Sequence, residues 1–177
     1  MSDVFVYVDE SVRSGRYVIC CVHVEADRAG ALRRRVRQLL LPGQRKLHFK
    51  KEGPRRRKEL LRAFDALDVR AVAYICRMRQ GRDESAARAM CLARAVRDIQ
   101  SLGATAQLLL ESRDHLDEGD RVTILRARSA GTVLSFEHLA PTGDPLLWLA
   151  DGLAWPVSVG GEWRQRLPAG LEIVDIG

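Results

Sequence analysis

The chain lacks the features of a membrane-embedded or secreted protein. Its longest nearly uncharged stretch, residues 145–161, is interrupted by Asp151 and Pro156 and is too short to cross a bilayer. Its first residues contain no basic segment followed by an apolar segment and a small-residue cleavage site, so no secretory signal is expected. We therefore expect a soluble, cytoplasmic protein.

Cysteine is scarce, and its placement indicates neither disulfides nor zinc. The four cysteines lie inside apolar runs, without a CxxC pair or a histidine at ligand spacing. Buried thiols in a reducing compartment are expected. The chain also has no GxGxxG or Walker loop and no internal repeat. At 177 residues it can bury about 70% of its unfolded surface, so residues 1–177 are expected to form a single domain.

Positive charge is concentrated in one segment. The net charge is +6, and thirteen lysines and arginines lie between residues 28 and 58. Such a patch attracts polyanions, of which nucleic acid is the commonest in a cell. A solvated helix surface is the alternative interpretation. The residues expected to contact phosphates are Arg45, Lys46, Lys50, Lys51, Arg55, Arg56 and Arg57. The arginine and alanine content is typical of a high-GC bacterial genome.

Hydrophobic periodicity predicts an α/β sheet with helices packed on it. Asp27 and Asp144 are expected to cap helices, and Pro156 to limit or kink the last helix. The segment 113–128 is expected to be partly helical. Strands are predicted over residues 4–8, 16–24, 69–79, 105–112 and 133–139, with a short one near the end, and helices over 28–41, 54–67, 83–102 and from Pro145 onward.

Three carboxylates stand in apolar surroundings. Asp9 and Glu111 each follow an apolar strand, and Asp151 is the lone charge of an apolar helix. If the two strands are parallel neighbours, their ends meet at the edge of the sheet where ligands bind. Converging carboxylates repel one another unless a cation neutralises them, which favours one or two Mg²⁺ or Mn²⁺ ions. A buried ion pair with an arginine is the alternative for Asp151.

Strand periodicity separates the neighbours Asp9 and Glu10. Asp9 shares a face with Tyr7, whereas Glu10 lies on the opposite face with Val8. Both cannot face one metal directly. Asp9 is therefore chosen as the ligand, and Glu10 is expected to support the site from behind or to cap a neighbouring element.

The order of four short motifs resembles a known family. YVDES, LHF, LLLESRD and PLLWLADGLAW resemble the domain-of-unknown-function 3800 (DUF3800) family over residues 4–159. The resemblance implies a ribonuclease-H-like fold, with three antiparallel strands followed by parallel strands beside the first. It also implies an acidic cluster of Asp9, Glu111 and Asp151, with His48 nearby as a proton donor or substrate contact. This chain has DESV where the family has DESG, and Glu111 where an aspartate is usual.

Two functions follow from these patterns. The first is a metal-dependent nuclease that hydrolyses phosphodiester bonds of RNA or DNA. The second is an inactive module of the same fold that holds nucleic acid or a partner protein, because fold alone does not imply chemistry. For His48 a structural hydrogen bond is the alternative to catalysis, and Glu137 or Asp114 could replace Glu111 among the acids. Trp148 and Trp155 share a helical face, which is typical of core packing.

Overall fold

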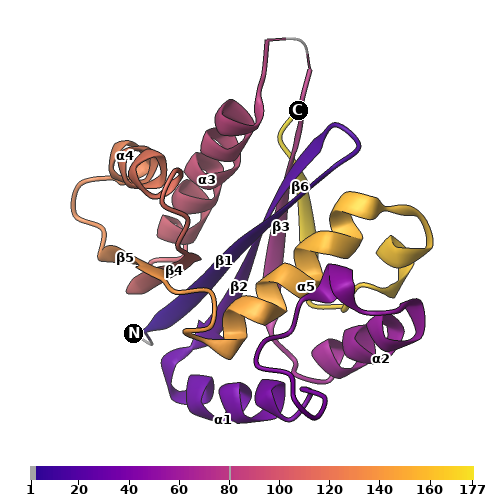
Figure 1. Cartoon of the computed structure of the whole chain (residues 1–177). Coiled ribbons are helices and arrows are strands. Elements are labelled where there is room, and N and C mark those ends of the chain that lie inside the picture. Colours follow the sequence, from indigo (N-terminus) through magenta and orange to yellow (C-terminus); the bar gives the residue numbers. More distant parts are fainter. Residues whose placement is uncertain (1–2, 80) are drawn as a thin grey trace.

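A six-stranded mixed sheet runs through the centre of the protein and carries helices on both faces (Figure 1). The computed structural model describes residues 3–79 and 81–177. The strand order is β5-β4-β1-β2-β3-β6. The strands are β1 (Val4–Arg13), β2 (Arg16–Glu25), β3 (Arg70–Arg77), β4 (Ala106–Glu111), β5 (Leu134–Leu139) and β6 (Leu171–Asp175).

The pairing of the strands confirms the predicted fold class. β1, β2 and β3 are antiparallel, whereas β4 lies parallel to β1 and β5 parallel to β4. β6 adds a further parallel strand beside β3. This is the expected arrangement of three antiparallel strands with later parallel strands next to the first.

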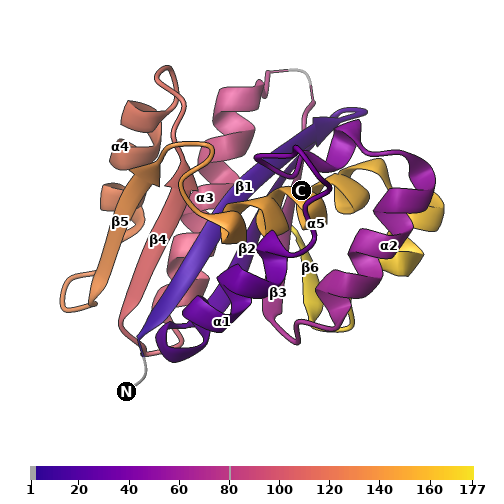
Figure 2. The same cartoon turned by 60° about the horizontal axis from the view of Figure 1, so that its bottom comes forward.

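The helices divide between the two faces of the sheet, as the two views show (Figures 1 and 2). α3 and α4 cover one face, and α1, α2 and α5 cover the other with the short 3₁₀ helices η1 and η2. No helix within the described residues is long and apolar enough to cross a membrane. The helices are α1 (Ala26–Arg37), η1 (Phe49–Lys51), α2 (Pro54–Asp65), α3 (Glu84–Gln100), α4 (Asp117–Ala127), α5 (Pro145–Val159) and η2 (Gly161–Arg166).

Each face of the sheet has its own hydrophobic core, and β1 contributes to both. Tyr7 packs in the core beneath α5, and its neighbours Val6 and Val8 pack in the core beneath α3. Burial on both faces explains why the start of β1 reads as an unbroken apolar run. The four cysteines are buried free thiols, as predicted.

Several predicted boundaries were wrong. β1 continues past its acids to Arg13, because β2 pairs with it along its whole length. α1 begins at Ala26, so Asp27 lies in its first turn and does not cap it. Asp144 does cap α5, by accepting the N–H of Leu146. α5 continues through Pro156 to Val159, so this proline does not end the helix.

Gly152 lets η1 and α2 approach α5 closely. A Cβ at this position would lie 2.6 Å from Cε2 of Phe64 and 3.2 Å from Cδ2 of Phe49. Phe49 also packs on Trp155, with 5.6 Å between ring centroids. Trp155 and Trp148 are both buried, as their helical spacing predicted. These contacts fix the loop that carries His48 against α5.

Candidate functional site

The three predicted carboxylates line one cleft of about 890 Å³. In the parallel pairing of β1 with β4, Val8 lies opposite Leu110, so Asp9 and Glu111 each stand one residue beyond this pair. Asp151 reaches the same cleft from α5. The ends of two neighbouring parallel strands and one helix therefore bring together residues that are distant in the sequence.

Asp9 is the most buried of the three acids, with 5% of its surface exposed. Its Oδ1 accepts the N–H of Glu10 at 2.8 Å and lies 3.6 Å from Nη2 of Arg113. Burial raises the pKa of Asp9 well above its usual value, and the nearby Asp151 raises it further. Glu10 and Glu111 act in the same direction. Asp9 is thus surrounded by three other carboxylates, and the cation nearest to it among the described ion pairs is Arg113 at 3.6 Å.

Asp151 is partly compensated by its neighbours. Its Oδ2 accepts the main-chain N–H of Phe49 at 3.1 Å. Burial raises the pKa of Asp151, whereas this N–H, Lys46 and His48 oppose the rise. The predicted alternative for Asp151 was an ion pair with an arginine, and in the structure its hydrogen-bond donor is a peptide group.

Lys46 enters the cleft as a cation beside Glu111. Its Nζ donates to Oε2 of Glu111 at 3.0 Å, and both side chains are largely buried. His48 lines the same cleft, and burial followed by the charge of Lys46 lowers its pKa. The lowered pKa favours the neutral imidazole, which can accept a proton near the carboxylates.

Glu10 points to the opposite face of β1, as strand periodicity predicted. Its two carboxylate oxygens accept from Arg88 of α3 and from Arg113, which follows β4. Arg113 thereby bridges Glu10 and the edge of Asp9. Glu10 thus lines the same cleft from the opposite face of β1 and is held there by two guanidinium groups.

Arg88 is the centre of a buried network that sequence reasoning missed. Its guanidinium donates to both oxygens of Asp120, at 2.7 Å each, and at 3.1 Å to the hydroxyl of Tyr17. A signal was present in the sequence, because Arg88 falls in the apolar stripe of α3 with Cys91 and Leu92. A charged residue in such a stripe needs a buried partner.

Among the described residues, Asp117, Asp120 and His138 form the one group of three potential metal ligands whose atoms lie within 4.8 Å of one another. Their carboxylates are already engaged. Asp120 is bound by Arg88, and Asp117 accepts the hydroxyl of Ser112 at 2.6 Å and the N–H of Arg113 at 2.7 Å. We therefore interpret this group as the support of the Arg88 network.

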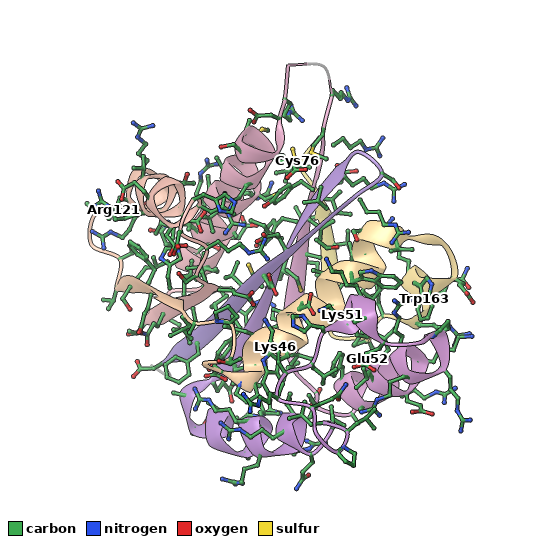
Figure 3. The ribbon with its side chains drawn as sticks, viewed as in Figure 1. Lys46, Lys51, Glu52, Cys76, Arg121 and Trp163 are labelled. Atoms are coloured by element: carbon green, nitrogen blue, oxygen red, sulfur yellow. The ribbon has the colours of Figure 1, made fainter. Side chains whose placement is uncertain are left out.

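The predicted phosphate-binding residues fall into two sets. Lys50 and Lys51 are exposed and line the cleft, and Arg45 is exposed on the loop before η1. Figure 3 shows Lys46 and Lys51 on the α5 side of the sheet, whereas Arg121 lies on α4 across it. Lys46, Lys50 and Lys51 thus line the same cleft as the carboxylates.

The arginines of α2 are engaged within the protein. Arg57 stacks on Trp155, with its Cζ 4.2 Å from the ring centroid, and donates to the carbonyl oxygen of Phe49 at 3.1 Å. Arg56 donates to the carbonyl oxygen of Leu39. Arg55 is exposed and pairs with Glu59 at 3.2 Å. Arg55 is thus the arginine of this set most accessible to a ligand.

The fold is similar to that in the "Crystal structure of the ribonuclease H2 from Pyrococcus horikoshii OT3". The TM-score is 0.56 and the sequence identity is 16%, over 86% of this chain and 70% of that chain. No family profile matches the sequence, and no curated protein matches it. The likeness confirms the predicted ribonuclease-H-like fold. The resemblance to the domain-of-unknown-function 3800 family stays a prediction.

Proposed function

We propose that the protein is a divalent-metal-dependent nuclease that hydrolyses phosphodiester bonds of RNA or DNA. The observation that carries the proposal is the convergence of Asp9, Glu111 and Asp151 in one cleft, with Asp9 buried among like charges. Such an arrangement is costly for folding unless a cation binds there. The fold shared with a ribonuclease H2 structure supports the proposal.

The donor set of the cleft fits Mg²⁺ or Mn²⁺. Asp9, Glu111 and Asp151 offer oxygen ligands, which these ions prefer. When bound, the metal would activate a water molecule and stabilise the leaving oxygen of the phosphodiester. The largely buried position of the carboxylates would strengthen their attraction for the cation.

The other residues of the cleft would position the substrate. Lys50 and Lys51 would hold the phosphate backbone without reading the base sequence. His48 is placed to move a proton at the reacting phosphate, because its imidazole lines the cleft and has a lowered pKa. Binding to nucleic acid should therefore weaken as the salt concentration rises.

A second function is favoured by the ion pair between Lys46 and Glu111. The ammonium group already neutralises one of the three carboxylates at 3.0 Å. An inactive module that uses the lysines to hold nucleic acid or a partner protein would need no other cation in the cleft. The two functions differ in whether a divalent metal displaces Lys46.

Calorimetric titration with Mn²⁺ tests the nuclease proposal. We expect binding to the wild type and its loss in Asp9→Asn, which keeps the acceptor for the N–H of Glu10. Asp27→Asn is the matched control, because Asp27 is an exposed acid in the first turn of α1. Wild-type protein that binds no Mn²⁺, even with an oligonucleotide present, would contradict the nuclease and favour the module.

Activity is tested with labelled single- and double-stranded RNA and DNA in the presence of Mn²⁺. We expect cleavage by the wild type and by Asp27→Asn, and none by Asp9→Asn. Equal cleavage by Asp9→Asn and the wild type would point to a contaminating nuclease and remove the support for this site.

A further inference from the structure

A second cavity lies at the tip of the β1–β2 hairpin, outside the acidic cleft. Its volume is about 380 Å³, and it is lined by the hairpin turn, the end of β3, and residues of η2 and β6. Four arginines line it, and the single carboxylate among the lining residues is Asp175. We call this cavity the arginine pocket. Its lining arginines are Arg16, Arg77, Arg79 and Arg164.

The backbone around the arginine pocket is held in place. Ser14 and Gly15 both have positive φ angles, 51° and 71°, which is the two-residue turn that matches the twist of a hairpin. The carbonyl oxygen of Gly15 accepts the N–H of Met78 at 2.7 Å, which ties the turn to the end of β3. The guanidinium groups therefore converge from elements that are fixed to one another.

The charges of the pocket are far from balanced. Arg77 lies 3.3 Å from Asp175, with both side chains about half exposed. The pKa of Asp175 is lowered first by the N–H of Gly177 and then by Arg77 and Arg164. One carboxylate thus faces four guanidinium groups, which leaves an excess of positive charge. Guanidinium groups bind phosphate oxygens with two parallel hydrogen bonds, so a phosphate group fits this pocket.

The arginine pocket adjoins the acidic cleft across the hairpin. Arg13 lines the cleft, and the next residue, Ser14, lines the arginine pocket. The hairpin and the carboxyl terminus lie at the same end of the sheet (Figures 1 and 2). Five residues of extended chain separate Asp9 from Ser14, which is about 17 Å.

We propose that the arginine pocket binds the phosphate backbone of the same nucleic-acid strand that enters the acidic cleft, about 17 Å along the hairpin from Asp9. This inference rests on the proposed function, because it takes the strand in the cleft as given. In this arrangement the nucleic-acid strand passes over the β1–β2 hairpin, which lies between the two cavities. The contact recognises backbone charge and carries no base specificity.

Binding without metal tests this inference separately from catalysis. Fluorescence anisotropy is measured in EDTA with labelled single-stranded oligothymidylates of about 20 and about 2 nucleotides, one able to span both cavities and one too short. The test variant is Arg79→Ala/Arg164→Ala. The charge-matched control is Arg97→Ala/Arg126→Ala, two exposed arginines on α3 and α4. Lys50→Ala/Lys51→Ala reports on the cleft.

We expect the test variant to bind the long oligonucleotide about tenfold more weakly, with a salt slope shallower by about 1.4, because two phosphate contacts contribute about 0.7 each. Its affinity for the short oligonucleotide should equal that of the wild type. The lysine variant should weaken binding of both lengths, and the control should change neither. Arg79→Gln alone should reduce the slope by about 0.7, which keeps the test decisive if the double variant is unstable.

Three results would overturn the inference. If the salt slope of the test variant is unchanged while the lysine variant binds both oligonucleotides more weakly, the arginine pocket does not contact the strand. The proposed function is then unaffected. If the charge-matched control loses as much affinity for the long oligonucleotide as the test variant does, the effect comes from net charge and not from the arginine pocket. Wild-type protein that binds neither length excludes the shared strand, and Mn²⁺ titration then decides the metal site by itself.

Discussion

The main-chain N–H of Phe49 donates to Oδ2 of Asp151 across 3.1 Å, and the ring of Phe49 packs beside Gly152, the next residue of α5. These two contacts hold η1 against α5, and the ring can approach so closely because Gly152 has no side chain. The loop that carries Lys46 and His48 depends on this contact for its position.

Gly152→Ala should damage the fold and the site together. The added methyl group would meet Phe64 at 2.6 Å, and overpacking of this kind costs about 1–3 kcal/mol. We expect lower stability in urea denaturation and weaker Mn²⁺ binding. The matched control is Gly119→Ala in α4, where a Cβ meets nothing within 4 Å and should stabilise the helix by up to about 1 kcal/mol. Equal stability of Gly152→Ala and the wild type would contradict the packing argument.

Lys46→Met should strengthen metal binding. The ammonium group competes with a divalent ion for Glu111, and its removal should raise the Mn²⁺ affinity on the order of tenfold, equivalent to about 1.4 kcal/mol. Lys58→Met, outside the cleft, serves as the control in the same calorimetric titration. An affinity that stays constant or falls in Lys46→Met would show that Glu111 is not a ligand.

Asp9→Asn should stabilise the metal-free protein. The substitution removes a buried charge that Asp151, Glu10 and Glu111 disfavour. Each kcal/mol gained corresponds to a rise in Tm of about 2–4 °C for a chain of this size. Added Mg²⁺ should raise the Tm of the wild type but not of the variant. Thermal melts in EDTA and in Mg²⁺ provide the comparison, and a lower Tm of the variant in EDTA would refute the prediction.

Arg88→Met should be strongly destabilising. The substitution removes the guanidinium group shared by Glu10 and Asp120, and leaves Glu10 paired with Arg113 and Asp120 in contact with His138. Breaking a buried ion pair costs about 3–5 kcal/mol. Arg97→Met, at an exposed position of the same helix, should stay within about 0.5 kcal/mol of the wild type. Urea denaturation of both variants measures the difference. A loss below about 1 kcal/mol in Arg88→Met would indicate that solvent reaches the network.

His23 should make the protein sensitive to acid. Its Nε2 is buried and has no hydrogen-bond partner in residues 3–79 or 81–177, and burial, followed by the charge of Arg70, lowers its pKa from 6.5 to about 4. The unfolded chain therefore binds more protons than the folded protein between these values, so stability falls as the pH drops through this window. The contribution is at most about 3 kcal/mol. His23→Gln should flatten this part of the stability curve, and an identical curve would contradict the assignment.

The sequence allowed much of the fold and part of the site to be predicted. Buried strands show as apolar runs, and carboxylates at their ends indicated that Asp9 and Glu111 would meet. The partners of these acids were not predictable, because Lys46 and Arg113 reach them through tertiary contacts that leave no local pattern. Arg56 and Arg57 look like free surface charges in the sequence, yet they bind carbonyl oxygens and Trp155.

The pairing of β1 with β2 also decides which acid of β1 lies on which face of the sheet. Asp9 lies opposite Cys20 and faces the α5 side, and Glu10 lies opposite Ile19 and faces Arg88. A shift of one residue in this pairing would exchange the two acids between the faces of the sheet. A single residue inserted into β1 before Asp9 would therefore turn Asp9 toward the face of Arg88 and Glu10 toward the face of α5. The register of these two strands therefore determines the geometry of the acidic cleft as much as the identity of its acids does.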